Sequence, residues 1–152
     1  MVSAIVKSLL RSKSFLPNEI SCCSANDGTS DALSLETGIT RCTDVAALLQ
    51  QNPNLLILGC KPQQLAELPL QIAESSKDLV ILSIMAGITL DRLKSVFPLA
   101  RNIVRSMPNT PGQIGSGITG FLFASPPQEK DQLSVHKVLS SLGVVKEVKE
   151  EE

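Results

Sequence analysis

The sequence lacks tryptophan and tyrosine and has only four phenylalanines. Proteins that stack bases or sugars build those platforms from aromatic side chains, and this chain has little material for them. It also lacks an excess of positive charge, because 14 Lys and Arg stand against 15 Asp and Glu and give a net charge of −1. Without a basic surface, binding to nucleic acid or to an anionic membrane has no electrostatic basis. We expect neither partner.

Metal ligands are scarce as well. The four cysteines (Cys22, Cys23, Cys42 and Cys60) contain no C-x-x-C pair, and the single histidine, His136, lies far beyond the last of them. A structural zinc site takes about four well-placed nitrogen or sulfur ligands, so no metal site is expected. The same spacing shows no disulfide framework, which indicates reduced thiols and a cytoplasmic compartment.

Long apolar runs are absent: none approaches the roughly 18 residues that a membrane span needs. Residues 1–18 carry basic residues and serines but no acid, as mitochondrial presequences do. Their apolar residues nevertheless follow the i, i+3, i+4, i+7 stripe of a helix that packs on a core (Val2, Ile5, Val6, Leu9 and Leu10). We favour the structural helix and a cytoplasmic location, with a mitochondrial location as the alternative.

What the chain does contain is an alternation of short apolar runs with helical patterns, within the length of a single domain. The predicted strands are 19–24, 39–42, 55–59, 79–84, 102–107, 118–123 and 144–148. The first predicted helices are 30–37, which ends at Gly38, and one capped by Thr43 that runs through Gln51. A third starts at Pro62 and is broken at Pro69, and a fourth is capped by Thr89. The Ser125–Gln128 capping box opens the last helix, which carries Leu133, Val138, Leu139 and Leu142. This pattern predicts an α/β fold with a Rossmann-like, doubly wound, mainly parallel sheet.

One glycine motif is misleading. Gly115–Gly120 satisfies G-x-G-x-x-G letter for letter. The dinucleotide fingerprint, however, needs a strand before the first glycine and a helix after the last. Here a proline-rich loop precedes the glycines and an apolar run, Phe121–Phe123, follows them. We therefore interpret these glycines as serving a tight loop and close strand packing.

Three other segments each follow a predicted strand: Gly59–Pro62, Ser83–Gly87 and Arg105–Pro111. Each taken alone also fits a purely structural role, as a solvated lysine, a tight turn or a rigid bend. In a doubly wound sheet, ligands bind outside the carboxyl ends of the strands. Three such segments on one edge therefore predict a ligand crevice.

These segments, in this order and spacing, resemble the cofactor-binding domain of pyrroline-5-carboxylate reductase. That family has V-K-P-x, S-x-x-A-G-[IV] and R-x-M-P-N-[TS]-P segments, and Cys60–Gln63, Ser83–Ile88 and Arg105–Pro111 match them. The resemblance runs over nearly the whole chain, and Met-Pro-Asn-Thr-Pro is its most specific part.

The resemblance implies a function and a site. The family reduces 1-pyrroline-5-carboxylate, a small imino acid, to proline with a hydride from NADPH or NADH. By resemblance, the residues that border the nicotinamide half of the cofactor are Cys60, Lys61, Pro62, Ile84, Met85 and Ala86, with Asn109 at the same cleft. Ser24 would meet the ribose on the adenine side or its 2′-phosphate, and the Ser24–Asn26 segment has no arginine to hold that phosphate, which leaves NAD and NADP both open. No catalytic residue is assigned.

Two parts of the family pattern have no counterpart here. The family begins with a strand and G-x-G-x-[ML], whereas this sequence starts at the methionine of that motif; it also ends at Glu152, where the family's helical dimerisation domain begins. We therefore expect residues 1–152 to form an N-terminally truncated NAD(P)-binding domain, with two apolar strand edges exposed and little reductase activity alone.

Two alternatives remain beside the truncated reductase. The first is a non-catalytic binding or regulatory module that keeps the Rossmann-like surface. The second is another NADP-dependent reductase of the same superfamily, of the 6-phosphogluconate or F420-dependent type, against which the Met-Pro-Asn-Thr-Pro loop argues.

Overall fold

The structure, a computed structural model, describes residues 2–24, 28–69, 71–109 and 117–149. Its helices are α1 (Val2–Arg11), α2 (Thr29–Thr37), α3 (Val45–Leu49), α4 (Ile72–Ser75), α5 (Leu90–Val96) and α6 (Glu129–Ser140), with 3-10 turns η1 (Pro17–Glu19) and η2 (Pro62–Glu67). Its strands are β1 (Ser21–Cys22), β2 (Thr40–Arg41), β3 (Leu55–Leu58), β4 (Val80–Ser83), β5 (Asn102–Met107), β6 (Gly117–Phe123) and β7 (Gly143–Glu147). The alternation confirms the predicted α/β class.

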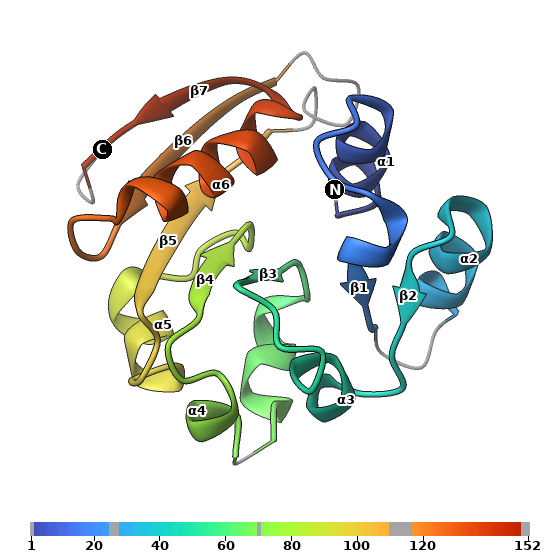
Figure 1. Ribbon diagram of the computed structural model, residues 1–152. Helices are drawn as coiled ribbons and strands as arrows, with labels where there is room; N and C mark the ends of the chain where they lie inside the picture. The colour runs from blue at the N-terminus through green and yellow to red at the C-terminus, as the bar shows by residue number, and fades with distance from the viewer. Residues whose placement is uncertain (1, 25–27, 70, 110–116, 150–152) are drawn as a thin grey trace.

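The strands form two sheets. Five of them make one sheet in the order β3-β4-β5-β6-β7, and β1 and β2 make a separate parallel pair (Figure 1). All pairs in the larger sheet are parallel except β5 with β6, so the sheet is mainly parallel, as predicted. Among the described residues, no strand joins β1 to β3.

Apolar side chains pack on both faces of the larger sheet, and its second strand, β4, is buried along its whole length. Ile81 contributes to one hydrophobic cluster with Leu93 and Phe97 of the α5 region. Val80 and Leu82 point to the other face and join a cluster with α1 and α6. The alternation of consecutive side chains along β4 thus serves two helical layers at once.

Helix α1 connects the two sheets. Ile5 and Leu9, exposed by 1% and 4%, pack in the α6-side cluster of the larger sheet. Val6, on a neighbouring face of the same helix, packs with Leu33 and Ile39 beside β1 and β2. These contacts confirm that the apolar stripe near the N-terminus belongs to a core helix.

Local predictions at two helix starts were wrong. Asp44, not Thr43, caps α3, with its carboxylate accepting a hydrogen bond from the Ala47 N–H at 2.8 Å. Pro62 does open a helix, which has 3-10 geometry. Ser125 does not cap α6, because its backbone and hydroxyl bond the buried Asn102 side chain instead, and Gln128 takes the cap position.

One residue of the last helix was assigned to the wrong environment. Leu133 is 59% exposed, although Val138, Leu139 and Leu142 are buried as predicted. Val135 fills the core position in that part of α6, at 1% exposure. An ion pair also attaches the first turn of α6 to the rest of the protein. Arg101 donates to both carboxylate oxygens of Asp131, from Nε at 2.9 Å and from Nη2 at 2.8 Å.

Candidate functional site

The three segments singled out in the sequence follow strands that lie side by side. Strands β3, β4 and β5 are consecutive parallel neighbours, with Leu58 paired to Ser83 and Ser83 paired to Arg105 (Figure 1). Because parallel strands end at the same edge of a sheet, the residues after them lie along one line. We call residues 59–62, 84–87 and 108–109 the carboxyl edge.

Direct contacts link the first two of these segments. The Cys60 thiol lies 3.6 Å from the Met85 sulfur, although the two residues are 25 positions apart in the sequence. The Ile84 N–H also donates to the Leu58 carbonyl at 3.0 Å, which continues the ladder one residue past the strands. The structure therefore brings Cys60, Ile84 and Met85 together, as the site prediction requires.

Buried serines hold the ends of β4 and β5 in place. The Ser106 hydroxyl donates to the Ser83 carbonyl at 2.6 Å, and both residues are fully buried. The Ser83 hydroxyl accepts from the Met85 N–H at 3.2 Å and so fixes the turn that follows β4. Neither serine was expected to have a role from the sequence. A hydroxyl inside an apolar strand is the signal that points to one, since buried polar groups need partners.

Lys61, Pro62 and Ala86 occupy the exposed rim of the edge. The Lys61 N–H donates to the Gln64 side chain at 2.8 Å, and Pro62 starts η2, so the backbone there turns sharply away from the sheet. This arrangement leaves the Lys61 side chain in solvent at the mouth of the edge. Its ammonium forms no ion pair among the described residues.

The third segment is described only as far as Asn109. The Asn109 side-chain oxygen accepts a hydrogen bond from the Ile118 N–H at 3.2 Å, which ties the end of β5 to β6. Thr110 and Pro111 lie outside the described residues, as do Gly115 and Ser116 of the misleading glycine motif. Gly117–Gly120 of that motif belongs to β6, so a strand and not a helix follows the glycines, as predicted.

Ser24 stands apart from the other predicted residues. It follows β1 in the smaller sheet, and its hydroxyl donates to the Ser30 hydroxyl at 2.9 Å, while the Ser30 N–H donates back to it at 3.2 Å. These bonds fix the start of α2. No described contact joins Ser24 to Cys60, Met85 or Asn109, so its place in the site stays a prediction.

A feature that the sequence did not reveal is the start of α1 at this edge. The Val2 side chain packs directly against the Cα of Gly59 and leaves no room there for a side chain. Glycine is thus needed for close approach, and not for an unusual backbone angle. The contact places the N-terminal end of α1, with its unpaired N–H groups, beside the end of β3.

The chemistry available at the carboxyl edge is sparse. Burial raises the pKa of the Cys60 thiol, against a smaller lowering by a backbone hydrogen bond, so the thiol is neutral near pH 7. Lys61 is the one charged side chain among the described residues of this edge. Such a surface can hold and orient a flat cofactor, and it offers little for protein-based proton transfer.

Comparison with known proteins identifies the family. Residues 1–87 match the family of proteins described as "NADP oxidoreductase coenzyme F420-dependent". The chain belongs to this family. Membership as an NADP oxidoreductase agrees with the nicotinamide dinucleotide expected from the sequence. The matched residues end before the Met-Pro-Asn-Thr-Pro segment, so this family match does not test that loop.

Curated relatives match almost the whole chain. Pyrroline-5-carboxylate reductase of Synechocystis sp. is 32% identical over 153 residues, which covers 99% of this chain and 55% of the relative. The Staphylococcus aureus (strain COL) reductase is 29% identical over 99% of this chain and 56% of its own length. The chain therefore spans about half the length of the curated relatives it matches.

Solved structures of other proteins have the same fold as this chain. A pyrroline-5-carboxylate reductase from Coxiella burnetii superposes with a TM-score of 0.86 at 22% identity, over 97% of this chain and 55% of that one. The Plasmodium falciparum pyrroline carboxylate reductase, solved with NADP bound, gives 0.79 at 18% identity, over 97% and 53%. The Rossmann-like fold predicted from the sequence is confirmed.

Proposed function

We propose that this chain supplies the dinucleotide-binding half of a pyrroline-5-carboxylate reductase, which reduces 1-pyrroline-5-carboxylate to proline with a hydride from NADPH or NADH. The convergence of three strand ends at one edge, joined by the contact of Cys60 with Met85, carries the proposal. Similarity to the Synechocystis and Staphylococcus reductases over almost the whole chain supports the choice of substrate.

Each predicted cofactor residue has a role in this proposal. Met85 and Ile84 form a partly apolar wall for the nicotinamide ring, and Cys60 closes its other side as a neutral thiol. Lys61, at the rim, offers its ammonium to the carboxamide or a cofactor phosphate. Hydride transfer depends on holding the dihydropyridine face toward the iminium carbon, so positioning groups without acid or base chemistry suit it.

The start of α1 provides the phosphate contact. Helix N-terminal N–H groups and the helix dipole favour anions. Because Val2 packs on Gly59, this helix end lies at the same edge as Cys60, in reach of a pyrophosphate that joins the nicotinamide and adenine halves. Ser24, after β1, then stands on the adenine side.

A strand between β1 and β3 would complete the sheet. Both of those strands lack a partner on their facing sides within the described structure, and α1 packs against both sheets. A strand placed there and parallel to β1 and β3 would end at the carboxyl edge, where the chain would then enter α1. We assign this position to a strand that precedes Met1 in the intact polypeptide.

The substrate pocket and the dimer contacts fall to residues beyond this domain. Ile118 and Val144 are paired across β6 and β7 and are 59% and 66% exposed, which leaves an apolar patch on an uncovered face of the sheet. Relatives are nearly twice as long. We assign the covering of this patch to a following helical, oligomerising segment.

The sharpest test separates cofactor binding from turnover. NADPH titrated into the chain should show enhanced nicotinamide fluorescence, free of interference because the sequence has no tryptophan. Lys61→Ala should weaken binding about tenfold, as expected for loss of one charge-assisted hydrogen bond. Lys77→Ala, an exposed lysine away from the carboxyl edge, serves as the matched control.

Reductase activity is measured in the same preparation with pyrroline-5-carboxylate. We expect little or no turnover from residues 1–152 alone, and turnover when a preceding strand and a following helical segment are restored. If the restored protein binds NADPH but does not reduce this substrate, the reductase assignment is wrong. Absence of NADPH binding in both forms would contradict the carboxyl-edge site itself.

A second candidate is a binding module without catalysis, and the unpaired edges of β1 and β3 favour it. In that case a strand of another protein fills the gap. Size-exclusion chromatography with light scattering distinguishes the two: a well-behaved folded monomer or a defined hetero-complex supports the module, and aggregation supports the reductase fragment.

A cytoplasmic location belongs to this proposal. All four cysteines are free, and α1 is packed in the core. Within the described residues, no helix has the length and apolar character to span a bilayer. Fluorescent tagging of the C-terminus in the source cell tests the location.

A further inference from the structure

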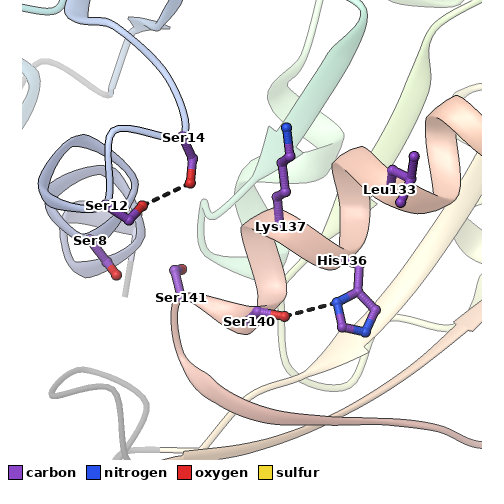
Figure 2. A pocket seen from close by; sticks show the side chains of 8 residues that line it. All are labelled: Ser8, Ser12, Ser14, Leu133, His136, Lys137, Ser140 and Ser141. Atoms are coloured by element: carbon purple, nitrogen blue, oxygen red, sulfur yellow. Dashed lines mark hydrogen bonds between the residues drawn. The ribbon is translucent and has the colours of Figure 1, made fainter.

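A serine-lined groove between α1 and α6 is separate from the carboxyl edge. Its volume is about 400 Å³. Figure 2 shows serines of α1 and the turn after it facing α6 across the groove. The residues that carry the argument are Ser8, Ser12, Ser14, His136, Lys137 and Ser140.

The charge in this groove has one sign. Lys137 lines it, and no Asp or Glu is among its described lining residues. Where the structure describes the chain, Lys137 has no carboxylate partner, unlike Lys7, which pairs with Glu36. Its ammonium lies 5.8 Å from the centre of the Phe15 ring, and that contact holds the cation without neutralising its charge.

Serine hydroxyls line the same groove. The Ser8 hydroxyl makes no hydrogen bond among the described residues, and the Ser14 hydroxyl shares one with Ser12 at 2.8 Å. Ser12 also donates to the Leu9 carbonyl at 3.2 Å, so it covers a carbonyl at the end of α1 that would otherwise repel an anion. Because the Ser12 proton goes to the Leu9 carbonyl, Ser14 donates the bond to Ser12, and the Ser8 hydroxyl remains able to donate to a ligand.

His136 extends the polar lining along α6. One of its ring nitrogens, Nδ1, bonds the Ser140 hydroxyl at 2.9 Å (Figure 2). This bond orients the ring and leaves Nε2 for another partner. An ammonium, an imidazole nitrogen and the Ser8 hydroxyl, at a groove with no carboxylate among its described lining residues, match the donor set that binds phosphate oxygens.

We propose that this groove binds the phosphate group of a small phosphorylated ligand, with Lys137 as its principal contact. The exposed Leu133 at the groove adds apolar surface for the body of such a ligand. The site shares no residue with the carboxyl edge and does not depend on the reductase assignment. A ligand held between α1 and α6 would also brace α1, which connects the two sheets.

The test is a titration of the ¹⁵N-labelled protein with inorganic phosphate, followed by amide NMR at constant ionic strength. We expect saturable shifts at Ser8, Ser14 and Lys137. Lys137→Met, which keeps the side-chain stem on Phe15, should weaken phosphate binding about tenfold. Lys130→Met, on the same helix but outside the groove, should change it by less than about twofold.

Ser8→Ala is the second variant, chosen because no described hydrogen bond is lost in the free protein. It should weaken phosphate binding about fivefold, as expected for one neutral donor. Equal effects of Lys137→Met and Lys130→Met, or shifts scattered over all surface lysines, would overturn the proposal. Displacement of phosphate from the groove by NADP would show that the groove belongs to the cofactor site instead.

Discussion

At the scale of single residues, the candidate site depends on side chains that touch across long sequence separations. Cys60 meets Met85, and Ser106 meets Ser83, each pair joining two strand ends. The sequence identified Cys60 and Met85 through their position after apolar strands. It could not identify the contact of Val2 with Gly59, because that contact depends on how α1 docks on the sheet.

The Cys60 thiol should react slowly with alkylating agents. Its pKa is raised by burial, so less of it is thiolate at pH 8 than in an unfolded cysteine. The iodoacetamide rate, followed by mass spectrometry of the Cys60 peptide with Cys60→Ser as the control, should be below that of the denatured protein and should rise as pH increases past 9. Saturating NADPH should slow it further. A rate at pH 8 equal to that of denatured protein would contradict the burial described here.

The raised pKa of the Cys60 thiol also determines how this residue makes the stability of the fold depend on pH. A thiol whose pKa is raised on folding favours the folded state while it stays protonated, and this advantage is lost as pH rises through the folded pKa. Cys22 and Cys23 also have raised pKa values, mainly through burial. The three thiols therefore contribute to unfolding at alkaline pH and not at acid pH.

At the scale of elements, helix starts were the least predictable feature. Thr43 and Ser125 both have the residue types of N-caps, and neither caps a helix in the structure. The Asp44 side chain, and not that of Thr43, accepts the capping hydrogen bond of α3. Ser125 instead donates its N–H to the side chain of Asn102, 23 positions away. A neighbouring cap residue decided the first case, and a distant hydrogen-bond partner decided the second.

The junction of α6 with β7 depends on glycine. Gly143 has a φ of 126°, and a Cβ there would collide with the backbone of Gly117 in the paired strand. Gly143→Ala should therefore lower the free energy of unfolding by roughly 2 kcal/mol or more. Urea unfolding followed by circular dichroism measures the change.

Gly28→Ala is the matched control for this variant. Gly28 also has a positive φ, of 81°, but nothing lies within 4 Å of its Cβ position. Only the backbone cost of about 1 kcal/mol should appear there. Equal destabilisation by the two substitutions would mean that the strand contact at Gly143 contributes nothing.

At the scale of the whole molecule, the division into two sheets is the main feature. The exposed strand edges expected from the sequence agree with the unpaired facing sides of β1 and β3 among the described residues. Helix α1 is what holds the sheets together, through Ile5 and Leu9 on one side and Val6 on the other. The smaller sheet, with only two residues in each strand, has little other support.

Hydrogen exchange should reflect this division. We expect amides of β1, β2 and α2 to exchange much faster than those of β4, which is buried and paired on both sides. Adding the preceding strand should slow exchange in β1 and β3 and leave β6 and β7 unchanged. Uniform protection across both sheets without that strand would show that the gap carries no energetic cost.

The sequence by itself determined the α/β class, the order of the strands along the chain and the three segments of the carboxyl edge. These follow from local causes: apolar periodicity sets strands and helices, and parallel strands place their ends together. Only the tertiary structure decided that Ser125 bonds Asn102 instead of capping α6, which glycines are indispensable, that Leu133 is exposed, and that a groove lies between α1 and α6. Those features depend on packing and hydrogen bonds between residues distant in the chain, and no local pattern encodes which distant group arrives.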